Sequence, residues 1–258
     1  MFKILLVGCN GKMGKTIEKC VEDRNDCEIA AGVDKSNKEN SYPTYNDFSN
    51  IKETPDVIVD FSHPSVLPSS LKYAKNNKIP MVIATTGLDR NDIELITDAS
   101  KEIAVFFTFN MSIGINLLSS LAKIATDVLS NDFDIEIIEK HHNQKIDAPS
   151  GTALMLANAI NETANNRYNY EFDRHSKREK RSENEIGIHS IRGGNIVGEH
   201  EVIFAGHDEV ITLTHQAFSK DVFAVGALNA AKFLLNKDSG LYNMDDLINK
   251  ECICNEQK

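Results

Sequence analysis

The opening of the chain carries the pattern that most restricts the fold. An apolar run of strand length, Phe2–Val7, leads directly into GCNGKMG at residues 8–14, after which apolar residues recur at helical spacing. A second strand is expected over Glu28–Val33, and it ends in Asp34-Lys35. A strand, a glycine-rich turn, a helix and a second strand that ends in an acidic residue form the dinucleotide-binding arrangement.

The residue types in this turn fit the binding of a pyrophosphate. Gly8 permits the tight turn, Gly11 lets the pyrophosphate approach the backbone, and Gly14 lets the helix pack close to the strand. The phosphates then meet the positive end of the helix dipole. The spacing is GxxGxxG, with Asn10 where the commoner GxGxxG has its second glycine. A purely structural turn is the alternative.

Asp34 and Lys35 bear on which nucleotide binds. A carboxylate at this place can accept hydrogen bonds from a ribose 2′-hydroxyl, whereas the neighbouring ammonium can meet a 2′-phosphate. Acid beside base indicates that both NADH and NADPH are accepted. The alternative is that both residues are solvated charges in a loop.

Strands and helices alternate through the first half, and this alternation predicts an α/β fold with a Rossmann-like, doubly wound parallel sheet. Ligands lie off the carboxyl ends of the strands in such sheets, so the loops at 84–87 and 108–111 are further cofactor-lining candidates. His63, beside Pro64, is expected to be a turn residue. The expected segments are a polar linker over Asn37–Thr54, strands over Asp56–Phe61, Ile79–Ala84 and Ala104–Thr108, and helical stretches to about Asn77 and over Asp89–Lys101.

The pattern changes after Asn110 to that of an α+β domain. Its strands are expected to form an open antiparallel or mixed sheet, whose edges self-association could cover. The charged stretch Asn165–Glu185 is expected to be a solvated loop, or else a flap that supplies a cation to the substrate. The expected elements are helices over Ile113–Leu129, Ala153–Asn161 and Val222–Leu235, strands over Ile186–Ile191, Ile196–Phe204 and Glu209–His215 with hairpin-like connections at 193–195 and 206–208, and an amphipathic tail over Leu241–Ile248.

The middle of the chain concentrates the groups that can do chemistry. The segment Glu139–Ala153, EKHHNQKIDAPSGTA, follows an alternating strand and contains His141, His142 and Lys145. It then opens a helix at Ser150-Gly151-Thr152. Imidazoles can donate protons near neutral pH, and an ammonium and the N–H groups of a helix start can bind anions. The cluster fits an anionic substrate that must also be protonated.

Composition excludes several other classes of protein. The formal net charge of −10 argues against a general nucleic-acid binder, and no apolar run approaches the ~20 residues of a membrane span. The N-terminus has no signal-peptide layout. The five cysteines have no zinc-site spacing, so we expect reduced thiols, no bound metal and a cytoplasmic location.

The central segment EKHHNQKIDAPSGTA resembles the signature of the 4-hydroxy-tetrahydrodipicolinate reductase family, formerly called dihydrodipicolinate reductases. The resemblance covers nearly the whole chain and is weakest over Asn37–Thr54 and Asn165–Glu185. Further motifs fall in the family's order and spacing: GCNGKMG, VDFSHP, ATTG at 84–87, FTFNMSIGIN and SIRGGNIVGEHEVIFAGHDEVITLTH.

The resemblance implies a nicotinamide-dependent reduction of a cyclic dicarboxylate, (2S,4S)-4-hydroxy-2,3,4,5-tetrahydrodipicolinate, in the lysine and diaminopimelate pathway. It gives catalysis to His141 and Lys145, and substrate binding to His142, Gly151, Thr152 and Thr86. It gives cofactor contacts to Gly8, Cys9, Asn10, Gly11, Lys12, Met13, Asp34, Lys35, Ala84, Thr85, Thr86, Thr108, Phe109, Asn110 and Met111.

The resemblance also implies a domain plan and an assembly. Residues 1–110 with 221–258 are expected to bind the dinucleotide, and residues 111–220 to bind substrate and build a homotetramer through the sheet. Lys35 stands where many members have arginine, and lysine offers a point charge instead of a bidentate fork, so a strong NADPH preference is not expected.

Two other functions stay open from the sequence alone. One is a different NAD(P)-dependent dehydrogenase that acts on another small carboxylate. The other is a non-catalytic dinucleotide sensor that signals through its oligomer. The sensor would bind nucleotide without turnover, and it gives no reason for the cluster of His141, Lys145 and Thr152.

Overall fold

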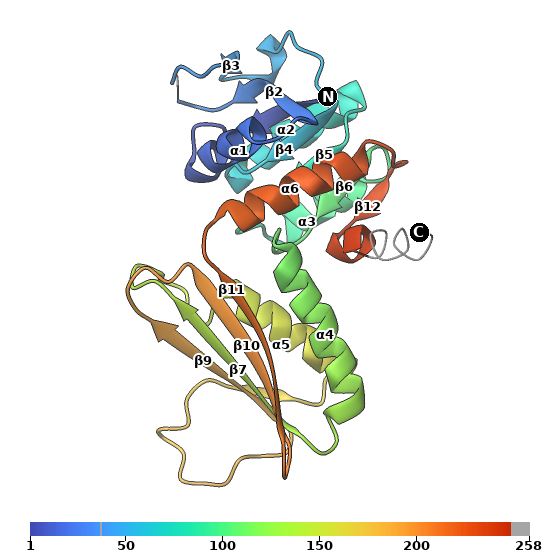
Figure 1. Ribbon diagram of the computed structural model, residues 1–258. Helices are drawn as coiled ribbons and strands as arrows, with labels where there is room; N and C mark the ends of the chain where they lie inside the picture. The colour runs from blue at the N-terminus through green and yellow to red at the C-terminus, as the bar shows by residue number, and fades with distance from the viewer. Residues whose placement is uncertain (37, 249–258) are drawn as a thin grey trace. The chain divides into compact units, whose positions relative to one another are not determined.

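A computed structural model describes residues 1–36 and 38–248 (Figure 1). The chain divides into two compact units. The first unit is Met1–Ile113 together with the chain from Lys220 onward, and the second unit is Gly114–Ser219. The expected linker position Asn37 and the cysteines Cys252 and Cys254 lie outside the described residues. Within the described residues, no helix is long and apolar enough to cross a membrane.

The first unit contains a seven-stranded sheet in which all neighbours are parallel, in the order β12-β6-β5-β4-β1-β2-β3. The chain leaves β1 toward β2 on one side and returns to β4 on the other, so the topological switch point lies between β1 and β4. The predicted doubly wound α/β sheet is confirmed. The strands are β1 (Phe2–Val7), β2 (Cys27–Val33), β3 (Thr44–Tyr45), β4 (Val57–Asp60), β5 (Met81–Ile83), β6 (Ala104–Phe107) and β12 (Gly240–Tyr242).

Both faces of this sheet are buried because its strands are apolar on both sides. Ile4 and Leu6 of β1 lie in one core with helices α1 and α6, whereas Leu5 and Val7 lie in the other with α2 and α3. Helix α6 therefore packs in the first unit, beside the helix that follows the glycine turn. The helices are α1 (Lys12–Glu22), α2 (Leu67–Asn77), α3 (Arg90–Ala99) and α6 (Asp221–Leu234).

Three short elements of the first unit were not expected. The polar linker contains β3 and a 3-10 helix over Phe48–Asn50, and the expected amphipathic tail begins with strand β12. Such pieces are too short to show a period in the sequence. β12 extends the sheet beside β6, where the ring of Tyr242 meets that of Phe233 edge to face. The tail continues as a helical turn over residues 244–248.

The second unit packs two helices on one face of a five-stranded mixed sheet with the order β11-β10-β7-β9-β8 (Figure 1). β7 alternates strictly, so Ile135 and Ile137 enter the core with Phe204 of β10. The elements are α4 (Ile113–Leu129), β7 (Asp134–His141), α5 (Gly151–Thr163), β8 (Asn169–Glu171), β9 (Glu185–Arg192), β10 (Gly198–Ala205) and β11 (Val210–Ala217).

One expected connection in this sheet is wrong. β9 and β10 follow one another in sequence, but β7 lies between them, parallel to β9 and antiparallel to β10. The connection at Gly193-Gly194 crosses the end of β7 instead of closing a hairpin, and the Gly193 N–H donates to the carbonyl of His141. The parallel register aligns Ile135 with Ile186 in the core, which favours this order. The hairpin between β10 and β11 is confirmed.

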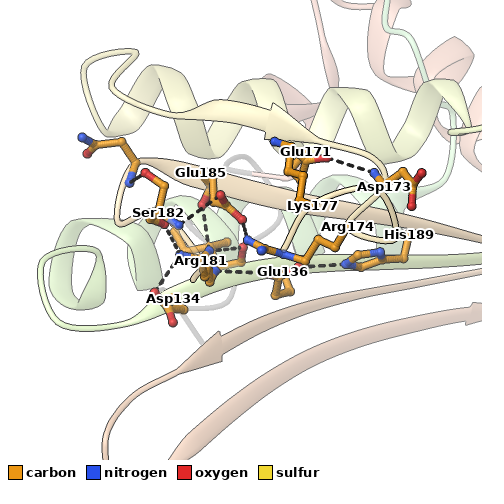
Figure 2. A network of polar contacts seen from close by, with 12 residues as sticks. Asp134, Glu136, Glu171, Asp173, Arg174, Lys177, Arg181, Ser182, Glu185 and His189 are labelled. Atoms are coloured by element: carbon orange, nitrogen blue, oxygen red, sulfur yellow. Dashed lines mark hydrogen bonds and ion pairs between the residues drawn. The ribbon is translucent and has the colours of Figure 1, made fainter. Parts of the chain in front are cut away.

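The charged stretch 165–185 is tied to the sheet by ion pairs and contains strand β8 (Figure 2). Arg181 donates to Glu136 Oε1 at 2.9 Å and to Asp134 Oδ1 at 2.7 Å, and also to the carbonyl of Glu185. Arg174 pairs with Glu185, and Lys177 with Glu171. These three cations are paired with carboxylates of the same unit, which neither the solvated loop nor the substrate flap anticipated.

Replacing Arg181 by alanine is expected to destabilise the second unit by about 1–3 kcal/mol, because two carboxylates and three backbone carbonyls lose a charged donor. The measurement is the urea midpoint of unfolding. Arg178→Ala is the matched control, since Arg178 is exposed in the same stretch. Equal midpoints for the two variants would show that the Arg181 contacts do not hold this stretch in solution.

Candidate functional site

The glycine-rich turn has a backbone that larger residues would not permit. Gly8 has a positive φ of +82°, and a Cβ there would lie 2.8 Å from the carbonyl oxygen of Phe61. At Gly14 a Cβ would lie 2.4 Å from the carbonyl oxygens of Gly8 and Cys9. Gly11 is the N-cap of α1, which has no side-chain cap among the described residues. The first N–H groups of α1 are therefore available to an anion.

Asn10 replaces the usual glycine because it connects the turn to the loop after β2. Its side chain donates to the carbonyl of Ser36 at 2.8 Å, and its backbone N–H donates to Asp34 Oδ2 at 3.0 Å. Asp34 also accepts from the backbone and hydroxyl of Ser36 at 2.9 Å each. A carboxylate has about four acceptor positions, so Asp34 can hold the loop and still accept from a ribose.

A cavity of about 790 Å³ opens beside this turn within the first unit. Five of the predicted site residues line it: Gly8, Gly11, Asp34, Lys35 and Thr86. His63, Lys72 and Tyr73 line it too, although His63 was expected to be only a turn residue and the other two were not predicted. His63 is also the N-cap of a short 3-10 helix over Pro64–Val66, as a turn residue should be.

Other predicted cofactor residues do not line this cavity. Cys9 and Met111 are core side chains, and burial raises the pKa of the Cys9 thiol to about 11. Phe109 is exposed, with its ring against that of Phe107. Asn110 accepts a hydrogen bond from the Ser112 N–H, and Thr85 is buried. The other predicted cofactor residues outside the cavity lining are Asn10, Lys12, Met13, Ala84 and Thr108.

Buried Asp60, the last residue of β4, connects the loops that follow two neighbouring strands. Its Oδ1 accepts from the Ser62 N–H at 2.9 Å and from the Thr85 hydroxyl at 3.2 Å. Its Oδ2 has no hydrogen-bond partner within the described part of the chain, and burial raises the pKa of this carboxyl group. Asp60 thus fixes the loop after β4 against the loop after β5.

In the second unit, the alternation of β7 places two functional groups on the helix-covered face. Glu139 is fully buried and His141 is 8% exposed. The His141 Nδ1 lies 2.6 Å from Glu139 Oε2. Burial lowers the pKa of His141, and the charges of Lys145 and Arg192 act in the same direction, whereas Glu139 opposes them. A Cβ on Gly198 would lie 3.1 Å from His141 Nε2, so this glycine leaves that nitrogen unobstructed.

Arg192, at the end of β9, holds the same carboxylate from the other side. Its two terminal nitrogens donate to Glu139 at 2.8 and 2.7 Å, and one of them also donates to the carbonyl of Asp147 at 2.6 Å. Burial would raise the pKa of Glu139, but the hydrogen bonds from Arg192, Ser190 and His141 outweigh it and hold that pKa at about 2. Glu139 is therefore a carboxylate over the physiological range.

The start of α5 lies against this group. Ser150 is the N-cap: its Oγ accepts from the Ala153 N–H at 3.1 Å, and its own N–H donates to Glu139 Oε1 at 3.1 Å. The Ser150 Oγ is also 3.0 Å from His200 Nε2. The His200 ring stacks edge to face on His141 at 5.2 Å, and burial lowers the pKa of His200 to about 3. His200 is thus a neutral packing partner.

The remaining predicted residues occupy the loop between β7 and α5. Lys145 Nζ pairs with Asp147 at 2.9 Å, and half-buried His142 accepts the Gln144 N–H on its Nδ1. Gly151 and Thr152 form the first turn of α5. The structure therefore brings His141, Lys145 and the helix start together within the second unit. The sequence missed Arg192 and His200, which lie far along the chain and reach β7 only through sheet pairing.

A glycine-turn cavity at the switch point of a parallel sheet, in one chain with a histidine–lysine cluster at a helix start, defines an oxidoreductase of the Rossmann class. Comparison with known proteins gives the particular family. Residues 2–111 match the family model for the dihydrodipicolinate reductase N-terminus, and residues 114–248 match that for its C-terminus.

Two curated relatives match along nearly their whole length. The 4-hydroxy-tetrahydrodipicolinate reductase of Caldanaerobacter subterraneus subsp. tengcongensis is 52% identical over 97% of this chain and 99% of its own. That of Clostridium tetani is 51% identical over 96% and 98%. The chain belongs to the 4-hydroxy-tetrahydrodipicolinate reductase family, as the sequence resemblance predicted.

A solved structure shares the fold. The dipicolinate-bound dihydrodipicolinate reductase from Paenisporosarcina sp. TG-14 superimposes with a TM-score of 0.77 over 94% of this chain and 97% of that one. Its sequence is 24% identical, so this likeness bears on the fold alone.

Replacing Gly14 by alanine is expected to weaken NADH binding about tenfold or more, because a Cβ 2.4 Å from two carbonyl oxygens must displace the turn. Fluorescence titration with NADH measures this. Gly193→Ala is the control, since apart from its chain neighbours no described residue has an atom within 4 Å of a Cβ built there. Unchanged affinity in Gly14→Ala would remove this turn from the nucleotide site.

Proposed function

We propose that the chain catalyses the NADH- or NADPH-dependent reduction of (2S,4S)-4-hydroxy-2,3,4,5-tetrahydrodipicolinate to (S)-2,3,4,5-tetrahydrodipicolinate in lysine and diaminopimelate biosynthesis. Relatives near 50% identity over their full length carry this activity in their names. The observation that carries the proposal most directly is the His141–Lys145 loop placed at the start of α5, above a buried carboxylate.

The reaction determines which groups the chain must supply. Replacing a ring hydroxyl by hydrogen releases water and consumes one hydride and one proton. NADH or NADPH supplies the hydride when bound. The protein must therefore provide a proton donor and bind two carboxylates of the ring.

His141 is the proton donor in this proposal. With Nδ1 directed at Glu139, its Nε2 is the atom that can give a proton, and Gly198 leaves space beside it. Burial lowers the pKa of His141 in the protein alone. A bound dicarboxylate would add negative charge nearby and raise that pKa toward neutrality, which favours the protonated imidazole during turnover.

The carboxylates of the substrate have two places to bind. The first N–H groups of α5, at Gly151 and Thr152, form a helix start suited to one carboxylate. Lys145 can exchange its present partner, exposed Asp147, for the other, with half-buried His142 beside it. The ammonium then also stabilises charge that develops on the ring.

The first unit fits the nucleotide. Its cavity and the close-packed glycines leave room for a pyrophosphate at α1, and Asp34 and Lys35 lie on the lining where a ribose 2′-hydroxyl or a 2′-phosphate would bind. In this proposal residues 1–110 with 221–258 bind nucleotide and residues 111–220 bind substrate. Thr86, which also lines the cavity, is assigned to both ligands.

Turnover is tested by mixing pyruvate and aspartate semialdehyde with the preceding synthase and following the absorbance of NADH or NADPH after this protein is added. Alanine at His141 or Lys145 is expected to lower kcat ~10²–10⁴-fold with little change in nucleotide affinity, the usual scale for a lost general acid or charged group. Ile146→Ala is the control, because Ile146 is 98% exposed in the same loop.

No oxidation of either nucleotide by the wild-type protein would contradict the proposed function. Nucleotide binding without turnover would favour the sensor, and turnover of another small carboxylate would favour the different dehydrogenase. Full turnover in both alanine variants would place the chemistry outside this loop.

We also propose a cytoplasmic homotetramer that forms through the sheet of the second unit. The face opposite α4 and α5 carries Ile191 and Val210, which are 47% and 61% exposed. Lysine at both positions is expected to lower the mass measured by sedimentation equilibrium, because charge would have to be desolvated in the interface. A tetramer that survives both changes would exclude this face.

A further inference from the structure

A single buried carboxylate, Glu139, contacts both the candidate proton donor His141 and the start of α5. Glu139 has no exposed surface, and it accepts hydrogen bonds from His141, Arg192 and the Ser150 N–H. Its Oε2 lies 2.6 Å from His141 Nδ1 and 2.8 Å from an Arg192 nitrogen. Its Oε1 accepts from the other Arg192 nitrogen at 2.7 Å and from the Ser150 N–H at 3.1 Å. The acceptor capacity of a carboxylate is then filled.

These contacts come from three elements that meet only in the folded unit. Glu139 and His141 are two residues apart on β7 and so share a face. The parallel pairing with β9 aligns His141 with Arg192. Ser150 caps α5, the helix whose first turn holds Gly151 and Thr152. One side chain thereby fixes the proton donor and the helix start relative to each other.

The ion pair between Glu139 and Arg192 determines whether a proton resides on Glu139 or on His141. A buried carboxylate without a partner takes up a proton, because desolvation penalises its charged form. A protonated Glu139 could donate a hydrogen bond to His141 Nδ1. His141 would then be a neutral imidazole with its single proton on Nε2, and not the imidazolium that donates a proton in the proposed reaction. Bidentate Arg192 keeps Glu139 an acceptor.

We propose that Glu139 and Arg192 form a positioning pair, in which the guanidinium holds Glu139 as a carboxylate so that His141 keeps its Nδ1–H toward it and presents Nε2 as the proton-donating atom. This inference rests on the proposed function of His141. Neither residue of the pair needs to touch the substrate.

The charges around His141 act on its protonation in opposite directions. The groups that face this imidazole are Glu139 on β7, Arg192 on β9, His200 on β10 and Lys145 in the loop, with His215 of β11 opposite His200 in the sheet. Glu139 favours the imidazolium, whereas Arg192 and Lys145 disfavour it. Glu139→Gln removes a negative charge beside the imidazole, so His141 loses its proton at lower pH. Loss of Arg192 removes a positive charge from the Glu139–His141 pair, so the one proton that the two groups then share is lost at higher pH, although more of it resides on Glu139.

The test is the pH dependence of kcat, which falls on the alkaline side as the imidazolium of His141 loses its proton. Glu139→Gln is expected to move this alkaline limb to lower pH by about one unit or more. Arg192→Met is expected to move it to higher pH, and Arg192→Lys to return it close to the wild-type position at reduced kcat. Arg178→Met, which removes an exposed charge of the same unit, should leave the limb in place.

The inference would be overturned if the alkaline limb moved in the same direction in Glu139→Gln and Arg192→Met, or did not move. A general loss of structure gives no reason for shifts of opposite sign, so such shifts would point to the pair. If Arg192→Met does not fold, Glu139→Gln and Arg192→Lys carry the test: a lower limb in the first and a near wild-type limb in the second support the pair, and any other result overturns it.

NMR titration of the His141 ring in the substrate-free protein separates this inference from the proposed function. The same opposite displacements are expected there, with the resonance assigned by its loss in His141→Gln. Unaltered or parallel displacements would overturn the positioning pair even if turnover is normal. Absence of turnover in the wild type, with opposite displacements present, would instead count against the proposed reaction.

Discussion

The second unit depends on keeping one ionised carboxylate out of water. Desolvating a carboxylate costs several kcal/mol, and only a close bidentate partner with further donors offsets that cost. Glu139 has both, from Arg192, His141 and Ser150. Because these partners come from β7, β9 and α5, the charge can be buried only when those three elements have the observed arrangement.

This requirement connects the sheet order with the chemistry. β7 lies in the middle of the sheet, and this central position gives Glu139 a neighbour on each side: His200 on β10 and Ser190 on β9. The connection through Gly193 and Gly194 reaches across the end of β7 and leaves Arg192 pointing at the carboxylate. A hairpin between β9 and β10 would have placed Arg192 and His200 on directly paired strands, with no access to His141.

The first unit depends on a different constraint, the close approach of backbone to backbone. Gly8 and Gly14 permit contacts that a Cβ would block, and Asn10 with Asp34 fixes the turn against the loop after β2. Asp60 does the same for the loops after β4 and β5. The cavity for the proposed nucleotide is thus formed by loops that hydrogen bonds hold at the carboxyl ends of the strands.

The sequence predicted what local pattern encodes. Strand–turn–helix periodicity gave the parallel sheet, a hydrophobic stripe gave α4, and the His141–Thr152 motif gave the family. It could not show that β7 separates β9 from β10, because turn residues report neighbours in the chain and not in the sheet. Arg192 and His200 were missed for the same reason, although Glu139 could have been found two residues before His141 on an alternating strand.

The proposed function requires that a hydride move from a nicotinamide to the substrate ring and that the proton come from His141. A single turnover with NADH deuterated at the transferable position, followed by mass spectrometry of the tetrahydrodipicolinate, tests it most directly. One deuterium in the product of the wild-type enzyme, formed far more slowly by His141→Gln at equal nucleotide binding, is the expected result. Product without deuterium, or equal rates in the two proteins, would contradict the claim.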